Sequence, residues 1–182
     1  GFINKYVPFY VKEGSLLSRY HVQDAYLQFF YKFIKPIRKS IERGDYDKNP
    51  QLALKTDTYK KWLGFAFERW CRQNHRLFAR ILGFEAVVYR QGAFFNRANA
   101  KEDAGYQIDL VYDRDDRIYT VCEIKYLQSP AGKEVVREFE RKLALFHNPK
   151  KRTLHKVLIT SEGVEKSVIQ AGYFDKIITL ND

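Results

Sequence analysis

The 182-residue sequence lacks several residue types and patterns, and each absence excludes a class of protein. Its two cysteines, Cys71 and Cys122, are too few for a disulfide framework, and neither has a neighbour at metal-binding spacing. No apolar run approaches the roughly 20 residues that span a membrane, and no signal peptide is visible. We therefore expect a reduced, cytoplasmic protein with no zinc site and no membrane partner.

Methionine is absent altogether, and the chain begins at Gly1. We expect a processed chain or an excised fragment whose N-terminal part is missing. Internal repeats and low-complexity tracts are absent too, which argues against a solenoid or a disordered linker.

Apolar residues and positive charge are plentiful. The apolar fraction of 45% is enough for a packed core, so a disordered chain is excluded. The formal net charge of +10 favours a polyanionic partner such as nucleic acid. Charge by itself leaves open a basic protein without such a partner.

The first part of the chain reads as a hairpin followed by an aromatic amphipathic helix. Strands are predicted over residues 6–12 and 18–22, and the helix over 22–37, with Asp24 at its first turn and Pro36 kinking or ending it. Residues 42–58 lose this periodicity and contain loop residues. We place a domain boundary there, giving segments 1–50 and 51–182.

The second part alternates helices and strands. A long helix is predicted over residues 59–82, ending at Gly83, with an apolar stripe of Trp62, Ala66, Trp70, Leu77 and Ile81. Strands are predicted over 85–90, 106–112, 118–126, 156–160 and 176–180, helices over 132–146 and 162–171, and a loop over 91–104. This order predicts an α/β fold with a mixed central sheet flanked by helices.

Three charged residues stand on the two central strands, which a short turn joins. Side chains alternate along a strand, so Asp109, Glu123 and Lys125 are predicted to point to one face. The opposite face is predicted to carry Ile108, Leu110, Cys122 and Ile124. Charges gathered in an apolar hairpin are costly without a partner.

A hard divalent cation would satisfy these carboxylates. Oxygen ligands in this number suit Mg²⁺ or Mn²⁺, with water and phosphate oxygens completing the shell. Such an ion lowers the pKa of a bound water and stabilises a phosphoryl group. Lys125 could position or activate that water or neutralise the phosphate, and Glu68 on the long helix could complete or flank the site.

These residues carry a resemblance to a known superfamily. A helix with Glu68, then Ile-Asp-Leu-Val over 108–111 and Glu-Ile-Lys over 123–125, resembles the PD-(D/E)xK nucleases, although no Pro precedes Asp109. The resemblance implies a restriction-endonuclease-like αβββαβ core. It also implies that Asp109 and Glu123 bind the metal, that Lys125 serves the attacking water, and that Glu68 assists the metal site. The implied activity is metal-dependent hydrolysis of DNA.

A wider resemblance covers most of the chain. Residues 19–34, 64–68 and 173–180 are similar to segments of archaeal-type P-loop ATPases, in which an ATPase module and a winged helix precede a nuclease-like C-terminal domain. The chain itself contains no phosphate-binding Gly-rich loop. The resemblance implies that segment 1–50 is a winged-helix tail, that 51–182 is the nuclease-like domain, and that an ATPase is an upstream or separate partner.

Other readings of the charged residues stay open. The strand carboxylates could be solvated edge residues, and the fold could hold DNA without cutting it or serve only to dock a protein. The predicted 132–146 helix carries Lys133, Arg137, Arg141 and Lys142, which we interpret as a solvated face in preference to a phosphate-binding one. Basic residues of two loops are open to either reading: Arg90, Arg97, Lys101, Lys150, Lys151 and Arg152.

Overall fold

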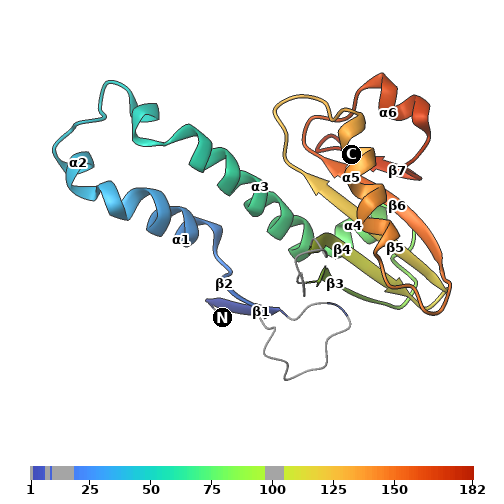
Figure 1. The fold of residues 1–182 in the computed structure, drawn as a ribbon. Coiled ribbons are helices and arrows are strands. Elements are labelled where there is room, and N and C mark those ends of the chain that lie inside the picture. The colour runs from blue at the N-terminus through green and yellow to red at the C-terminus, as the bar shows by residue number, and fades with distance from the viewer. Residues whose placement is uncertain (1, 7–8, 10–18, 97–104) are drawn as a thin grey trace.

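The computed structural model describes residues 2–6, 9, 19–96 and 105–182. A five-stranded mixed sheet with helices on both faces forms the main body, as the sequence predicted for an α/β protein. A helical arm projects from this body, and a two-stranded sheet lies beside the base of the arm (Figure 1).

The sheet has the order β3-β4-β5-β6-β7. Its strands are β3 (Tyr89–Asn96), β4 (Tyr106–Arg114), β5 (Ile118–Lys125), β6 (Thr153–Thr160) and β7 (Lys176–Ile178). The first three pair antiparallel and the last three parallel. Parallel neighbours need crossovers, which are supplied by α5 (Lys133–Ala144) and α6 (Lys166–Ala171).

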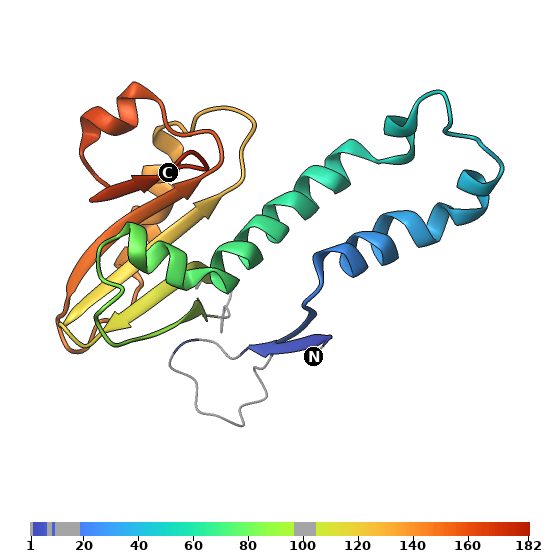
Figure 2. The same cartoon turned by 180° about the vertical axis from the view of Figure 1, so that it is seen from behind.

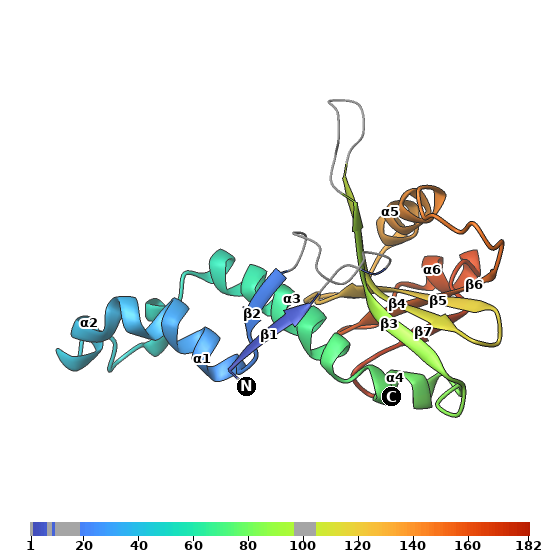
Figure 3. The same cartoon turned by 90° about the horizontal axis from the view of Figure 1, so that it is seen from below.

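Helices cover the two faces of this sheet, and each layer buries its own core. Seen edge-on, α5 and α6 lie on one face, while α4 (His75–Ile81) lies on the other (Figure 3). The α5 layer packs Phe139 against Val111, Val121 and other apolar residues of the strands. The opposite layer packs Phe67, Cys71 and Phe78 against Leu110, Cys122 and Ile124.

The predicted single helix over 59–82 is two helices. α3 (Thr56–Gln73) ends where Asn74 donates from its side chain to the Trp70 carbonyl at 2.9 Å, and α4 starts again at His75. Asparagine favours such local bonds over the helical path, which accounts for the break. The predicted stripe was also wrong in phase, since Phe67 and Cys71 are buried whereas Trp70 is 42% exposed.

Strand β3 lies later in the chain than predicted. Residues 85–88 form a turn, and the strand runs through 89–96, most of which was predicted to be loop. Gln91 and Gly92 look like loop residues in sequence, but β3 is the edge strand of the five-stranded sheet, where such residues are tolerated. The rest of that predicted loop, residues 97–104, lies outside the described residues.

The N-terminal hairpin forms with a different first strand. β1 (Ile3–Tyr6) pairs antiparallel with β2 (Arg19–Val22), so the second predicted strand is confirmed and the first begins earlier than residue 6. Residues 7–8 and 10–18 lie outside the described residues.

The helical arm consists of residues 25–42 and the first half of α3. Asp24 caps α1 (Ala25–Phe29) by accepting from the Leu27 amide at 2.8 Å. Pro36 does not end the helical path. A π-helical segment (Phe30–Ile34) and a 3₁₀ turn (Lys35–Ile37) pass it, and α2 (Arg38–Glu42) follows. A widened turn removes the clash of the proline ring with the preceding turn.

Aromatic rings join the two halves of the arm. Phe29 and Phe33 lie 5.6 and 5.7 Å, ring centre to ring centre, from Trp62, and Phe33 lies 5.7 Å from Tyr59. A short 3₁₀ segment (Pro50–Ala53) connects the halves. α3 then continues from the arm into the body, so one helix belongs to both parts (Figure 2). None of the helices that the structure describes is both long and apolar enough to cross a membrane.

Truncation of Phe139 should test the α5 layer. Phe139 is fully buried, stacks on Phe174 at 5.5 Å and packs against the sheet. We expect Phe139→Ala to lower the free energy of unfolding by about 3–5 kcal/mol, measured by urea denaturation. Ile169→Ala is the matched control because Ile169 is 62% exposed on α6, and it should change stability by less than about 0.5 kcal/mol. Equal effects of the two substitutions would contradict this packing.

Candidate active site

An extra residue in β4 creates the site. Two steps along β3, from Gly92 to Phe94, match three steps along β4, from Val111 to Ile108. Such a bulge breaks the alternation of side chains. Ile108 therefore packs in the α5 layer while Leu110 packs in the α3 layer, which corrects the predicted common face for these two residues.

Asp109 lies in this bulge, where β4 and β5 part. The last backbone pair of the two strands is Leu110 with Cys122. One step further, the Asp109 carboxylate accepts from the Ile124 amide at 3.0 Å, taking the place of a strand carbonyl. Gln107 donates to its other oxygen at 3.2 Å. Asp109 is 5% exposed, and these two bonds fix its carboxylate where the strands part.

Glu123 on β5 is the most deeply buried charge of the site. Its side chain has no exposed surface, and its Oε1 accepts from Lys142 Nζ at 2.6 Å and lies 3.1 Å from Lys125 Nζ. Its Oε2 is buried without a hydrogen-bond partner among the described residues. Burial and the nearby Asp109 raise the pKa of Glu123, against the opposing pull of the two lysines.

Lys125 lies between two carboxylates. Its Nζ is 2.9 Å from Glu138 on α5 as well as 3.1 Å from Glu123. Burial alone would lower the pKa of Lys125, but the two carboxylates outweigh it and raise that pKa. The ammonium therefore stays protonated at neutral pH and can neutralise or orient a charged group. It is not poised to accept a proton.

Glu68 faces the same opening from α3. Its side chain is 20% exposed and lies 3.6 Å from Arg72. Burial and the Asp109 carboxylate raise the pKa of Glu68 to about 7, although Arg72 acts in the opposite direction. Asp109 and Glu123 thus lie close enough to Glu68 to raise its pKa, and Lys125 lies beside Glu123.

Lys142 is part of this site although the sequence did not indicate it. The predicted solvated face of α5 is wrong for this residue, which is 7% exposed and bonded to Glu123. Glu138 and Lys142 are four residues apart, so they occupy one helix face. Lys142 Nζ lies 3.4 Å from Glu138 Oε1. The four-residue spacing is visible in the sequence, but it is equally typical of a solvated helix face.

Arginines and one threonine were also missed. Arg72 donates to the Asp109 carbonyl at 3.4 Å, and Arg69 lies one turn before it on α3. The Thr160 hydroxyl is buried without a hydrogen-bond partner among the described residues, and Thr160 pairs with Lys125 in the β5–β6 register. The helical repeat of Glu68, Arg69 and Arg72 on α3 was the sequence signal for the arginines.

The remaining predicted residues lie elsewhere. Arg90 and Arg152 bind Asp113 at the far end of β4, so they serve the fold and not this site. Arg97 and Lys101 lie outside the described residues. Cys71 and Cys122 are buried free thiols, and burial raises the pKa of both.

The carboxylates partly match the needs of a divalent ion. Within residues 2–6, 9, 19–96 and 105–182, no three His, Cys, Asp or Glu side chains are arranged so that they could hold a metal ion. Mg²⁺, however, commonly takes one or two carboxylates and fills its shell with water and phosphate oxygens. Asp109 and Glu123 fit that smaller set, since Glu123 has an uncommitted oxygen.

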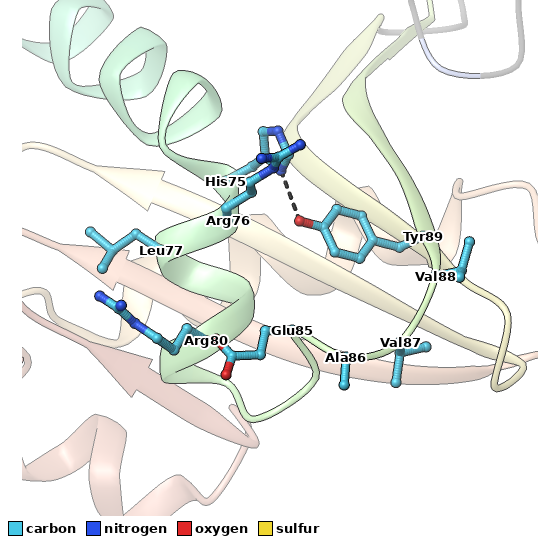
Figure 4. Close-up of a pocket in the computed structure, with 9 residues that line it drawn as sticks. All are labelled: His75, Arg76, Leu77, Arg80, Glu85, Ala86, Val87, Val88 and Tyr89. Atoms are coloured by element: carbon cyan, nitrogen blue, oxygen red, sulfur yellow. Dashed lines mark hydrogen bonds between the residues drawn. The ribbon is translucent and has the colours of Figure 1, made fainter.

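Among the described residues, one cavity lies away from these side chains and a smaller one includes Glu68. One of about 790 Å³ lies between α4 and the start of β3 and is lined by His75, Arg76, Arg80 and Tyr89 among others, with His75 hydrogen-bonded to Tyr89 at 3.0 Å (Figure 4). None of the four predicted site residues lines it. A smaller cavity of about 170 Å³ is lined by Glu68, Arg69, Arg72 and Gln107 from the body and by Tyr20 and His21 from β2.

The raised pKa of Glu68 predicts a pH-dependent stability. Between the ordinary value of 4.5 and about 7, the folded state holds a proton on Glu68 that the unfolded state has released. Rising pH therefore lowers the free energy of unfolding in this window. Between pH 5 and pH 8 in EDTA, wild type should lose roughly 2 kcal/mol more stability than Glu68→Gln, by urea denaturation.

The exposed carboxylate of Glu162 supplies the control for this measurement. Glu162→Gln should lose the same stability as wild type over this pH range. Parallel pH curves for wild type and Glu68→Gln would show that Glu68 is not held in the state described.

Comparisons with known proteins assign no function. No family model matches the chain. It is 26% identical over 147 residues to the uncharacterized protein MJECL04 of Methanocaldococcus jannaschii, an alignment that covers 79% of this chain and 31% of the relative. The crystal structure of the protein of unknown function AF1548 aligns with 57% of this chain and 54% of its own, at 20% identity and a TM-score of 0.37. The chain therefore spans about a third of the length of the curated relative it matches.

Proposed function

We propose that this protein hydrolyses DNA phosphodiester bonds with the help of Mg²⁺ or Mn²⁺, at the point where β4 and β5 part. The observation that carries this proposal is Glu123, a fully buried carboxylate with one oxygen held by lysines and the other without a described partner. A buried carboxylate oxygen beside a second carboxylate, Asp109, is costly to maintain for the fold alone. A divalent cation relieves that cost.

Asp109 and Glu123 would hold the ion, with Glu68 at its flank. A bound divalent ion lowers the pKa of a water and offsets charge on the phosphoryl group. Asp109 is already oriented by Ile124 and Gln107, so it presents its carboxylate without rearrangement of β4. Glu123 keeps its bond to Lys142 through Oε1, so Oε2 is the oxygen that would hold the ion.

Lys125 and Glu68 have separate roles in the proposed reaction. The protonated Lys125 neutralises charge on the phosphate or orients the attacking water. Glu68, with a pKa of about 7, is the carboxylate able to take up a proton near neutral pH. The net charge of +10 favours approach of the DNA backbone.

The wider restriction-endonuclease-like assignment is part of this proposal. It is supported by the order α3, β3-β4-β5, α5, β6 and by the Glu68, Asp109, Glu123 and Lys125 residues that the structure gathers. The ATPase partner rests on the sequence resemblance alone. We propose that this chain works as the C-terminal, nuclease-like part of such an ATPase or alongside a separate one.

A second function has its own support. Lys142 and Lys125 already compensate the charge of Glu123 without a metal. The same fold could thus hold DNA, or dock a protein, with no catalysis. Exposed aromatic residues on the arm, such as Tyr26 at 69% and Tyr31 at 57%, favour a role in contacts with another molecule.

Metal binding can be measured apart from catalysis. Titration calorimetry with Mn²⁺ should show binding to wild type and none to Asp109→Ala, because that substitution removes an oriented carboxylate. Asp115→Ala, in the exposed β4–β5 turn, is the matched control and should bind like wild type. Equal binding by wild type and Asp109→Ala would place the ion elsewhere, and no binding by the folded wild type would favour the second function.

Cleavage tests the chemistry itself. Wild type with Mg²⁺ or Mn²⁺ should cut plasmid or single-stranded DNA, and EDTA should abolish cutting. Asp109→Ala and Lys125→Ala should lose at least about 100-fold in rate, since each removes a group that meets the phosphate or its ion. Lys133→Ala, exposed on α5, should keep the wild-type rate. Cutting that persists in Asp109→Ala would refute this site, while metal binding without cutting would point to a required ATPase or a different substrate.

A further inference from the structure

The smaller cavity includes Glu68 and lies between β2 and α3. Its volume is about 170 Å³, and it is lined by Tyr20, His21, Phe65, Glu68, Arg69, Arg72 and Gln107. Four of these residues recur on α3 at positions 65, 68, 69 and 72, so they share one helix face. The β2 strand forms the wall opposite that face, and Glu68 belongs to both the cavity and the proposed active site.

Positive charge lines the inner part of the cavity. Burial lowers the pKa of His21, and Arg69 and Arg72 lower it further, so the imidazole is neutral at pH 7 and both guanidinium groups lie near it. Arg72 also lies 3.6 Å from Glu68 and donates to the Asp109 carbonyl at 3.4 Å. Guanidinium groups are well suited to bind phosphate oxygens.

Aromatic rings stand at the outer part of the same cavity. Phe65 is 59% exposed and Tyr20 is 66% exposed, and neither ring has an aromatic partner among the described residues. Lys5 places its ammonium 5.9 Å from the centre of the Tyr20 ring, which adds positive charge beside it. Exposed rings next to arginines are the combination that binds unpaired bases and their phosphates.

The size of the cavity limits what it can hold. Sites for whole small ligands usually enclose about 300–1,000 Å³, so 170 Å³ suits one group of a larger ligand. The 790 Å³ cavity in Figure 4 is large enough for a separate ligand, but it lies against α4 and β3 and none of the site carboxylates lines it. The smaller cavity is therefore the one that can hold part of a chain whose next phosphate lies at Asp109 and Glu123.

We propose that this cavity is a subsite for one unpaired nucleotide of the DNA strand, next to the bond that is cut. The base stacks on Tyr20 and Phe65, and its phosphate binds Arg69 and Arg72. A paired base within a duplex is stacked between its neighbours and cannot reach these rings. The substrate class is therefore single-stranded DNA, or DNA that is locally unpaired. This inference rests on the proposed function for the identity of the strand being cut.

Binding of short oligonucleotides tests the subsite without cleavage. In EDTA, the full chain is titrated into a fluorescently labelled 15-nucleotide single strand and into a 15-base-pair duplex with closed hairpin ends. Fluorescence anisotropy should give about ten-fold weaker single-strand binding for Phe65→Ala and for Tyr20→Ala. Duplex binding should not change in either variant.

Matched variants separate stacking from damage to the fold. Phe65→Trp keeps an aromatic ring and should retain wild-type single-strand affinity, whereas Phe65→Leu keeps apolar area but should lose it. Phe2→Ala removes a similarly exposed ring, at 78%, that does not line the cavity, and should bind as wild type does. Unchanged single-strand binding in Phe65→Ala and Tyr20→Ala, or equal losses for strand and duplex, would overturn the subsite.

Failure of the subsite and failure of the proposed function give different experimental results. Ring-dependent single-strand binding without any metal-dependent cutting would keep the subsite and refute the nuclease. Asp109-dependent cutting with ring-independent binding would keep the nuclease and refute the subsite.

Discussion

A carboxylate with no contact with water, Glu123, imposes the main constraint on this molecule. Its charge can be kept inside the sheet only if cations reach it, and the two that do come from different elements, Lys125 on β5 and Lys142 on α5. The same pairing fixes α5 against the strand that carries the site. The fold and the proposed chemistry therefore depend on one set of charges, and neither lysine can be changed without affecting both.

The bulge in β4 determines how Asp109 is oriented relative to Glu123 and Glu68. Backbone pairing of β4 and β5 stops at Leu110 and Cys122. Beyond that point the Asp109 carboxylate accepts a hydrogen bond from the Ile124 amide, so a side chain links the two strands there. A regular ladder would close the space and point Asp109 to one face. With the bulge, Asp109 faces both Glu123 on the sheet and Glu68 on α3, which the raised pKa of each glutamate reflects.

How much of this could be predicted from sequence differs from residue to residue. The strands around Asp109 and Glu123 follow a period-two pattern with a short turn, so their pairing was accessible. The bulge could not be predicted, because the sequence Ile-Asp-Leu is compatible both with a regular strand and with one that carries an extra residue. The break at Asn74 was hidden because apolar residues resume after it, and the edge strand β3 was hidden because its polar residues resemble a loop.

Lys142 shows a further limit of sequence reasoning. On a helix rich in both charges, nothing in the residue type distinguishes a solvated lysine from one that neutralises a buried carboxylate. Only the packing of α5 on β5 makes that distinction. The candidate site likewise depends on geometry that brings together residues far apart in the chain, from Glu68 on α3 to Lys142 on α5.

The continuity of α3 has a mechanical consequence. At about 1.5 Å per residue, its 18 residues make a rod about 27 Å long with Tyr59 and Trp62 in the arm at one end and Glu68 and Arg72 towards the other. Because one helix carries both ends, the position of the arm relative to Glu68 is set by helix geometry and not by a flexible linker. A molecule bound to the arm would therefore be held at a set distance from that carboxylate.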